Sequence, residues 1–300
     1  QMQNDPFLPL TSNAVLLNSG KLPGLPQGSL NGEVRTYNTS AQWNYKPSSR
    51  LSINARAKRY DVDNMTPSLL FGQYVPYDTS LSTKPPTSSF NPTRQVRSIP
   101  IEYNKSNLGA DANYLIVKKL SVKVAYDGER IDRKGRDSKT THEDTYTVAF
   151  NAGPYFDVMI RPSYQYARKT VEDYSSHHVA EETFLLGEGT ATGELSSLRK
   201  FDQAGRRRQK AILRADWDGL EAVNAGVDCG IAKDDYDAAY GLLDSRTSNA
   251  SVNVGVALFE RLNLYGDYTW EQTISHTRSR YSTRVASLGV PLNVPDNDWN

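Results

Sequence analysis

Apolar and polar residues alternate along most of this chain with the two-residue period of β-strands. In 262–271, for example, Leu262, Leu264, Gly266, Tyr268 and Trp270 alternate with Asn263, Tyr265, Asp267, Thr269 and Glu271. The same alternation runs through 51–58, 107–114, 120–129, 145–150 and 250–258, and more weakly through 158–168, 208–217 and 221–231. Because successive side chains of a strand point to opposite faces, each stretch predicts a strand with one apolar and one polar face.

Short turns and long polar connections follow each other in strict alternation. The short turns are predicted at 46–49, 117–119, 153–155, 218–219 and 259–261. The long connections are predicted at 65–98, 133–142, 170–204, 235–246 and from 275 onward. This order predicts about ten antiparallel strands in five hairpins, with every short turn at the same end. Outer-membrane barrels have that arrangement, with short periplasmic turns and longer extracellular loops.

Strand length and aromatic residues also favour a membrane barrel over a soluble sandwich. The alternating runs extend over about 10–15 residues, whereas ordinary strands have about 5–6 and a tilted membrane strand needs about 9–11. Aromatic residues gather near both strand ends, as in the two girdles of a membrane barrel. Pro162 lies in mid-strand without a ladder N–H, so a bulge or local break is expected there.

The composition of the chain further limits the classes of protein to which it can belong. The net charge is +1 and 38% of the residues are hydrophobic, with a mean hydropathy of −0.61. These values indicate neither a nucleic-acid binder nor a polybasic membrane binder, and a barrel with a wet interior accounts for the low apolar content. No apolar run is long enough for a membrane helix, and the lone Cys229 cannot form an intrachain disulfide.

The domain organisation follows from these elements. Residues 1–29 are predicted to be an irregular segment or loop, and 30–300 a partial outer-membrane barrel with long extracellular loops at 65–98 and 170–204. The chain has no signal-peptide pattern at its start and ends within an apparent strand, so we expect a mature or truncated fragment. Its sheet should be all-β, antiparallel, strongly curved and open at both lateral edges.

The polar faces of the strands supply the candidate functional residues. If the sheet belongs to a barrel, these faces line the lumen and contact either water or a partner inside. The candidate lumen-facing partner contacts are Lys123, Asp127, Arg161, Gln165, Arg214, Asp216, Asn253, Asp267 and Glu271. The clearest face assignment is that Val254 faces lipid and Asn253 the lumen.

Other candidate chemistry is weak. No nucleotide-binding, hydrolase or zinc-protease motif occurs, and no C-x-x-C-H haem-attachment motif, so we expect no enzyme and no cofactor bound by this chain. His177 and His178 lie among acidic residues in the 170–204 connection, where a solvated loop is favoured over a metal site. The run Arg206-Arg207-Arg208 begins a strand and could meet lipopolysaccharide phosphates, a partner carboxylate or solvent.

Several strings of residues, in this order, resemble the MtrB/PioB family of decahaem-associated outer-membrane β-barrels. They are Asn4-Asp5-Pro6-Phe7, Trp43-Asn44-Tyr45-Lys46-Pro47, Tyr60-Asp61-Val62-Asp63-Asn64, Arg130-Ile131-Asp132-Arg133, Leu198-Arg199-Lys200-Phe201-Asp202, Ala232-Lys233-Asp234-Asp235-Tyr236, Tyr240-Gly241-Leu242-Leu243-Asp244 and Glu260-Arg261-Leu262-Asn263-Leu264-Tyr265. The resemblance extends over nearly all of the chain. The C-x-x-C of many members' N-terminal regions is absent from this sequence.

What the resemblance implies is a function in the bacterial outer membrane. Members form large barrels that enclose a periplasmic multihaem c-type cytochrome in the lumen, and an extracellular multihaem cytochrome is a further partner. Electrons cross the membrane through the partner's haems, and the barrel itself binds none. The alternative functions are a passive diffusion porin for small solutes and a soluble β-protein such as a secreted adhesin.

Overall fold

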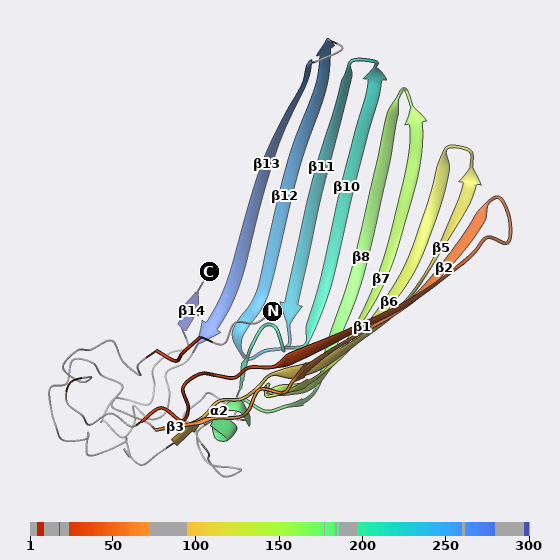
Figure 1. The fold of residues 1–300 in the computed structure, drawn as a ribbon. Helices are drawn as coiled ribbons and strands as arrows, with labels where there is room; N and C mark the ends of the chain where they lie inside the picture. Colours follow the sequence, from red (N-terminus) through yellow and green to blue (C-terminus); the bar gives the residue numbers. More distant parts are fainter. Residues whose placement is uncertain are drawn as a thin grey trace.

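The computed structural model describes residues 5–8, 18, 24–72, 95–176, 178–183, 185, 197–259, 262–279 and 297–299. Within these ranges the chain forms one large antiparallel sheet, which is strongly curved (Figure 1). Its long strands, of 12 to 20 residues, are β1 (Val34–Tyr45), β2 (Leu51–Asn64), β5 (Glu102–Val117), β6 (Leu120–Lys134), β7 (Ser138–Tyr155), β8 (Val158–Tyr174), β10 (Arg206–Leu220), β11 (Val223–Tyr236), β12 (Tyr240–Phe259) and β13 (Leu262–Ser279).

These ten strands are neighbours in sequence order, as the alternation predicts, from β1 at one edge to β13 near the other. The short strand β14 (Asn297–Trp299) pairs with the end of β13, and β9 (Leu198–Arg199) pairs with the start of β12 in parallel. Among the described strands β1 has no partner beyond β2, so the sheet is open, as expected. A small hairpin of β3 (Leu70–Gly72) and β4 (Gln95–Arg97) stands apart from it.

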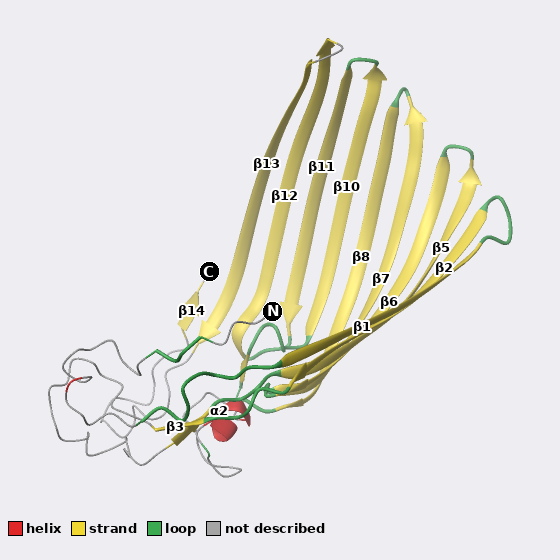
Figure 2. Ribbon diagram, in the orientation of Figure 1, coloured by secondary structure: helices red, strands yellow, loops and turns green. Residues whose placement is uncertain are grey.

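The short turns all lie at one end of the sheet, and the irregular segments, the helix α2 (His178–Thr183) and β3 lie at the other (Figure 2). The segment 46–50 joins β1 to β2, and Lys118-Lys119 joins β5 to β6, both as predicted. Of the last predicted turn, 259–261, residues 260 and 261 lie outside the described residues. The alternation of turns and loops therefore has the sidedness of an outer-membrane barrel.

Two predicted turn positions are wrong by a few residues. The β7–β8 turn is Phe156-Asp157 rather than 153–155, and both of its residues have positive φ, 51° and 62°. The β10–β11 turn is Glu221-Ala222 rather than 218–219. The Asp218-Gly219 pair forms an irregularity inside the ladder instead, where the register shifts between Trp217 and Leu220. Gly-Pro and Asp-Gly are turn-forming pairs, but a bulge tolerates the same residues.

Two predicted long connections are also wrong. The segment 133–142 contains only a three-residue turn, 135–137, and 235–246 only the three residues 237–239. The strands continue through the rest of each segment, although its residues do not alternate: 138–142 is polar on both faces, and 240–246 contains the adjacent apolar residues Leu242 and Leu243. Gly135 turns the chain from β6 into β7 at a φ of +70°, a conformation that glycine adopts without steric cost.

Pro162 interrupts the β7–β8 ladder without changing its register. Pairing stops after Ala149↔Ser163 and resumes at Ala152↔Ile160, which belong to the same register. On its other side Pro162 is paired with Leu213 of β10 in a continuous ladder. The expected local break is therefore present, and no bulge accompanies it at this point.

The most buried side chains lie at the loop end of the sheet. Gln203, Ala204, Asp137 and Ser138 are almost fully buried, and the Ser138 amide donates to Gln203 Oε1 at 2.9 Å. The segment 200–205 thus packs against the β6–β7 turn and forms a small core there. No helix in the part of the chain that the structure describes has the length and apolarity needed to cross a membrane.

Candidate functional site

The pairing registers place every long strand with its apolar residues on one face of the sheet. Residues directly opposite each other in an antiparallel ladder share a face. Val254 pairs with Ala225 and Gly266, and Asn253 pairs with Gly226 and Asp267. When the pairing registers are followed from strand to strand, the apolar residues on the same face as Val254 are Leu108, Val124, Tyr146, Tyr164, Leu213, Ile231, Val252 and Trp270. We call this the outer face and the opposite one the inner face.

Burial shows which face is concave. On the outer face Leu108 is 64% exposed and Ile231 is 50% exposed, whereas on the inner face Asp111 is 6% exposed and Asp234 is 7%. In a curved sheet, side chains spread apart on the convex face and converge on the concave one. The polar inner face is therefore concave, as in the lumen of a barrel, and the apolar face is turned outward.

Nothing in the described residues covers the outer face. Its long strands contact other strands only within the same sheet, and no second sheet packs against it. A soluble sandwich would bury this face. A row of aromatic residues crosses it, with the rings of Tyr126 and Tyr146 5.3 Å apart and Tyr166 opposite Tyr146. This row crosses the middle of β6, β7 and β8. At about 3.3 Å per residue and a tilt near 40°, Tyr166 lies about 20 Å from the short turns, close to the far edge of an apolar band about 25 Å high, where the second aromatic girdle is expected.

Among the described residues, three clusters of three or more charged side chains lie on the inner face, beside the single ion pair of Lys105 and Glu129. The first, the Asp111 cluster, links β2, β5 and β6. Arg56 contacts Asp111 at 3.2 Å and Asp127 at 2.5 Å. Lys123 Nζ lies 3.6 Å from Asp111, and Asn54 Nδ2 donates to Asp111 Oδ2 at 2.9 Å. Arg56 thus reaches from β2 past β5 to β6, which the convergence of side chains on a concave face permits.

The second, the Asp234 cluster, links β7, β10 and β11. Arg208 donates two hydrogen bonds to the carboxylate of Asp234, both at 2.7 Å. Arg206 lies 3.6 Å from Asp234 and donates to Glu143 at 2.8 Å, across the width of β8. The fork of Arg208 on a nearly buried carboxylate is the geometry of the strongest protein hydrogen bonds.

The third, the Asp216 cluster, lies nearer the short turns. Arg161 of β8 pairs with Asp216 of β10, and Arg214 of β10 contacts the same carboxylate at 3.0 Å. The three clusters hold neighbouring strands together by side chains as well as by the backbone ladder. They also neutralise much of the charge on the inner face within the chain itself.

All nine sequence-predicted residues lie on the inner face by register. Five of them belong to ion-pair clusters: Lys123, Asp127, Arg161, Arg214 and Asp216. The other four are Gln165, Asn253, Asp267 and Glu271, and their side chains have no hydrogen-bond or ion-pair partner among the described residues. Whether any of the nine contacts a partner stays a prediction.

Sequence reasoning missed the residues at the centres of two clusters. Arg56, Asp111, Glu143 and Asp234 lie on the inner face but were not among the candidates. Parity along each strand places them there, and only the register between strands shows that they meet. The run 206–208 is divided between the faces: Arg206 and Arg208 point inward to Asp234, and Arg207 lies on the outer face.

Among the described residues no group of three or more His, Cys, Asp or Glu side chains is arranged to hold a metal ion. His178 Nε2 lies 4.0 Å from Glu182 one helical turn away. His177 lies outside the described residues.

Comparison with known proteins matches the sequence to one family. The family model described as "Putative outer membrane beta-barrel porin, MtrB/PioB" matches residues 1–293. Outer membrane protein MtrB of Shewanella baltica (strain OS185) is 24% identical over 189 residues, which cover 61% of this chain and 26% of that protein. The matched part thus spans about a quarter of the relative's length.

Among solved structures, the chain is similar to outer-membrane proteins at low identity. A loop L8 deletion mutant of OmpT from Vibrio cholerae is 9% identical with a TM-score of 0.38, covering 81% of this chain and 94% of that one. The copper transporter OprC is 10% identical with a TM-score of 0.33, covering 84% of this chain and 57% of that one. At these TM-scores the likenesses add nothing to the assignment.

Proposed function

Because the chain belongs to the MtrB/PioB family of outer-membrane β-barrels, we propose that it forms part of a sleeve around a periplasmic multihaem c-type cytochrome. In this proposal the barrel contributes no haem and no catalysis. Electrons cross the outer membrane through the enclosed cytochrome, and an extracellular multihaem cytochrome receives or supplies them at the loop end. The observation that carries the proposal is the charged concave face opposite an apolar convex one.

The two faces meet two different requirements. Hydrocarbon cannot hydrogen-bond the polar surface of a soluble cytochrome, so that surface needs a polar wall between it and the lipid. The outer face presents Leu, Val, Ile and aromatic side chains to the bilayer, and the inner face presents hydroxyl, amide and charged groups to the lumen. A redox chain inside such a wall stays insulated from lipid and from bulk water.

The inner face also suits a protein partner in its charge. The charged residues of its largest clusters are already paired within the sheet. An enclosed protein therefore does not have to neutralise a high density of charges of one sign. The free side chains Gln165, Asn253, Asp267 and Glu271 are then the first candidates for direct contact. Asp267 and Glu271 are exposed on β13, four residues apart on the same face. Their carboxylates would accept hydrogen bonds from lysine or arginine side chains of the partner.

Co-purification tests this proposal. The full-length barrel, extracted from the outer membrane in an uncharged detergent, should carry a haem-staining partner. The double variant Asp267→Lys/Glu271→Lys should reduce the haem bound per barrel, because the new charges repel the partner's cations. Replacement of Thr277 by Lys is a control that adds one positive charge to the same strand at the loop end. A barrel that never retains haem would refute the sleeve.

The family description favours one second candidate, a passive diffusion porin. The word porin stands in the description of the matching family, and an open polar lumen would serve small solutes as well. Purified barrel without cytochrome would then release small sugars from liposomes at the rate of a wide pore. A sleeve that functions only when filled would give the same release when empty and lose it when the cytochrome is added back.

A further inference from the structure

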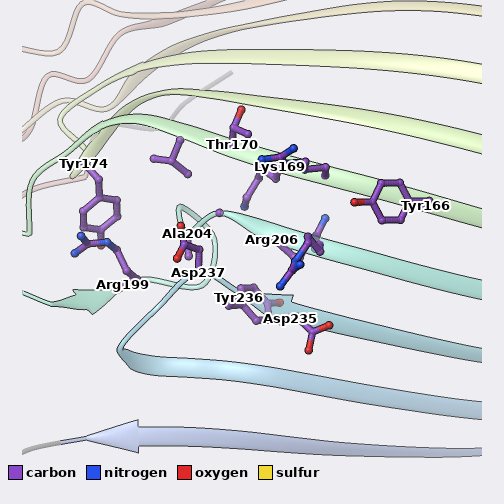
Figure 3. Close-up of a pocket in the computed structure, with 14 residues that line it drawn as sticks. Tyr166, Lys169, Thr170, Tyr174, Arg199, Ala204, Arg206, Asp235, Tyr236 and Asp237 are labelled. Carbon is purple, nitrogen blue, oxygen red and sulfur yellow. The ribbon is translucent and has the colours of Figure 1, made fainter.

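A groove of about 700 Å³ lies at the loop end of β8, β10 and β11. Tyr174 and Arg199 stand together at one end of it and Tyr166 at the other (Figure 3). The guanidinium of Arg199 lies over the ring of Tyr174, 4.2 Å from its centroid. The groove also contains Arg168 and Arg207, which form one cross-strand pair.

Arg168 and Arg207 are placed against the usual rules of strand pairing. They are directly opposite each other on neighbouring strands, where like charges destabilise a sheet. Both are exposed, and neither has a hydrogen-bond or ion-pair partner among the described residues. The adjacent cross-strand pair, Arg206↔Lys169, is also doubly cationic, but each of its members has an acceptor: Glu143 for Arg206 and the Asp202 carbonyl for Lys169.

The difference between these two pairs is the face on which each lies. Arg206 and Lys169 are on the inner face, and Arg168 and Arg207 are on the outer face, in line with Tyr166 and Gln209. They follow Tyr166 by two residues, which is about 5 Å along the membrane normal at a strand tilt near 40°. The aromatic row marks the edge of the hydrocarbon, so the two guanidinium groups are at the level of the lipid headgroups.

Each of these arginines also has a carboxylate directly opposite it on its other neighbouring strand, Asp144 for Arg168 and Asp235 for Arg207. Neither carboxylate pairs with the arginine: Asp144 accepts a hydrogen bond from the Tyr126 hydroxyl at 2.6 Å, and Asp235 contacts Lys233 Nζ at 2.9 Å. Asp237 lines the groove beyond Gly205. By contrast, two other outer-face arginines near this level, Arg59 and Arg130, are paired with Asp61 and Asp132 on their own strands.

We propose that Arg168 and Arg207 bind a phosphate group of the phosphorylated glycolipid of the outer leaflet. The loop end of an outer-membrane barrel is extracellular, and the lipid there carries phosphates at headgroup level. A phosphate between the two guanidinium groups accepts hydrogen bonds from both and removes their repulsion. Tyr166 contacts the lipid below it, and the groove behind receives the sugar. This site anchors the barrel in its membrane and is independent of what fills the lumen.

A binding measurement tests the site. The full-length barrel in an uncharged detergent is titrated with bisphosphorylated lipid A, and binding is followed by native mass spectrometry. The double variant Arg168→Gln/Arg207→Gln should weaken binding about tenfold or more, because two charge-assisted contacts are lost. Arg246→Gln removes an exposed arginine from the outer face of β12, outside the groove, and should leave the affinity unchanged.

Further arms identify the ligand. Dephosphorylated lipid A should bind the wild type as weakly as it binds the double variant. Inorganic phosphate should compete only at far higher concentration than the lipid, since it lacks the acyl chains. Equal affinity of wild type and double variant for the bisphosphorylated lipid would overturn the site, and so would an equal loss in Arg246→Gln. Competition by inorganic phosphate at the same concentration as the lipid would overturn the lipid assignment. If the double variant does not fold, the single variants Arg168→Gln and Arg207→Gln serve the same comparison.

Discussion

Substitution of neighbouring residues on β12 tests the assignment of the two faces. Val254 is 39% exposed on the outer face, and it is five residues from the turn-side end of β12 at Phe259. At about 3.3 Å per residue and a tilt near 40°, it lies about 13 Å from that end, near the middle of an apolar band about 25 Å high. Val254→Arg therefore places a charge at the depth where lipid-facing arginine costs about 2–4 kcal/mol of barrel stability.

The matched substitution Asn253→Arg places the same charge on the opposite face. Asn253 is paired with Gly226 on one side and Asp267 on the other. Gly226 has no side chain to obstruct a longer neighbour, and Asp267 provides a carboxylate at the directly opposite position. We expect a change of about 0.5 kcal/mol or less, the range of ordinary surface substitutions.

Urea unfolding of the full-length barrel in lipid vesicles measures both changes. With a urea m-value of about 2–3 kcal/mol/M, Val254→Arg should lower the midpoint by about 0.7–2 M, and Asn253→Arg should leave it nearly unchanged. The comparison requires that both variants keep the wild-type m-value, because a changed m-value would indicate a different unfolded state. Equal losses, or a larger loss in Asn253→Arg, would refute the assignment of lipid and lumen faces on β12.

Three further predictions concern the clusters and the turns. Asp111→Asn should cost about 1–3 kcal/mol in the same unfolding assay because it leaves Arg56 and Lys123 short of a nearly buried carboxylate, and Asp267→Asn, which breaks no contact, should cost less. A double-mutant cycle of Arg208→Gln and Asp234→Asn should give a coupling of about 1–2 kcal/mol, and additive losses would show that their two hydrogen bonds contribute nothing jointly. Gly135→Ala should cost about 1–2 kcal/mol because of its positive φ, whereas Gly28→Ala, with no atom within 4 Å of its added Cβ, should have no measurable effect on the midpoint.

The strand faces could be predicted from the sequence because a two-residue period needs no knowledge of neighbouring strands. Val254 and Asn253 were assigned from β12 alone, and the ladders to β11 and β13 confirm that they lie on opposite faces. The order of the hairpins could be predicted for a similar reason: each pair of strands is local in sequence. The resemblance to the family was visible in residue strings spread along the chain.

Strand ends and clusters could not be predicted in the same way. The two-residue alternation ends before the strands do, so the sequence of 133–142 and 235–246 indicates loops although the strands continue to three-residue turns. Gly153-Pro154 has the composition of a turn, yet the chain reverses at Phe156-Asp157. The Asp111 cluster joins β2, β5 and β6, and its members meet only once the register between those strands is known.

In the run 206–208, successive arginines point to opposite faces of the sheet and have different neighbours. Arg206 and Arg208 turn inward, where Asp234 and Glu143 take their hydrogen bonds. Arg207, between them, turns outward and meets Arg168 at the level of the headgroups. A slip of one residue in β10 would place two unpaired arginines on the lipid side and leave Asp234 without its fork. The ion pairs of the inner face therefore favour the observed register of this strand, and in that register Arg207 lies on the face where we propose that the anion binds.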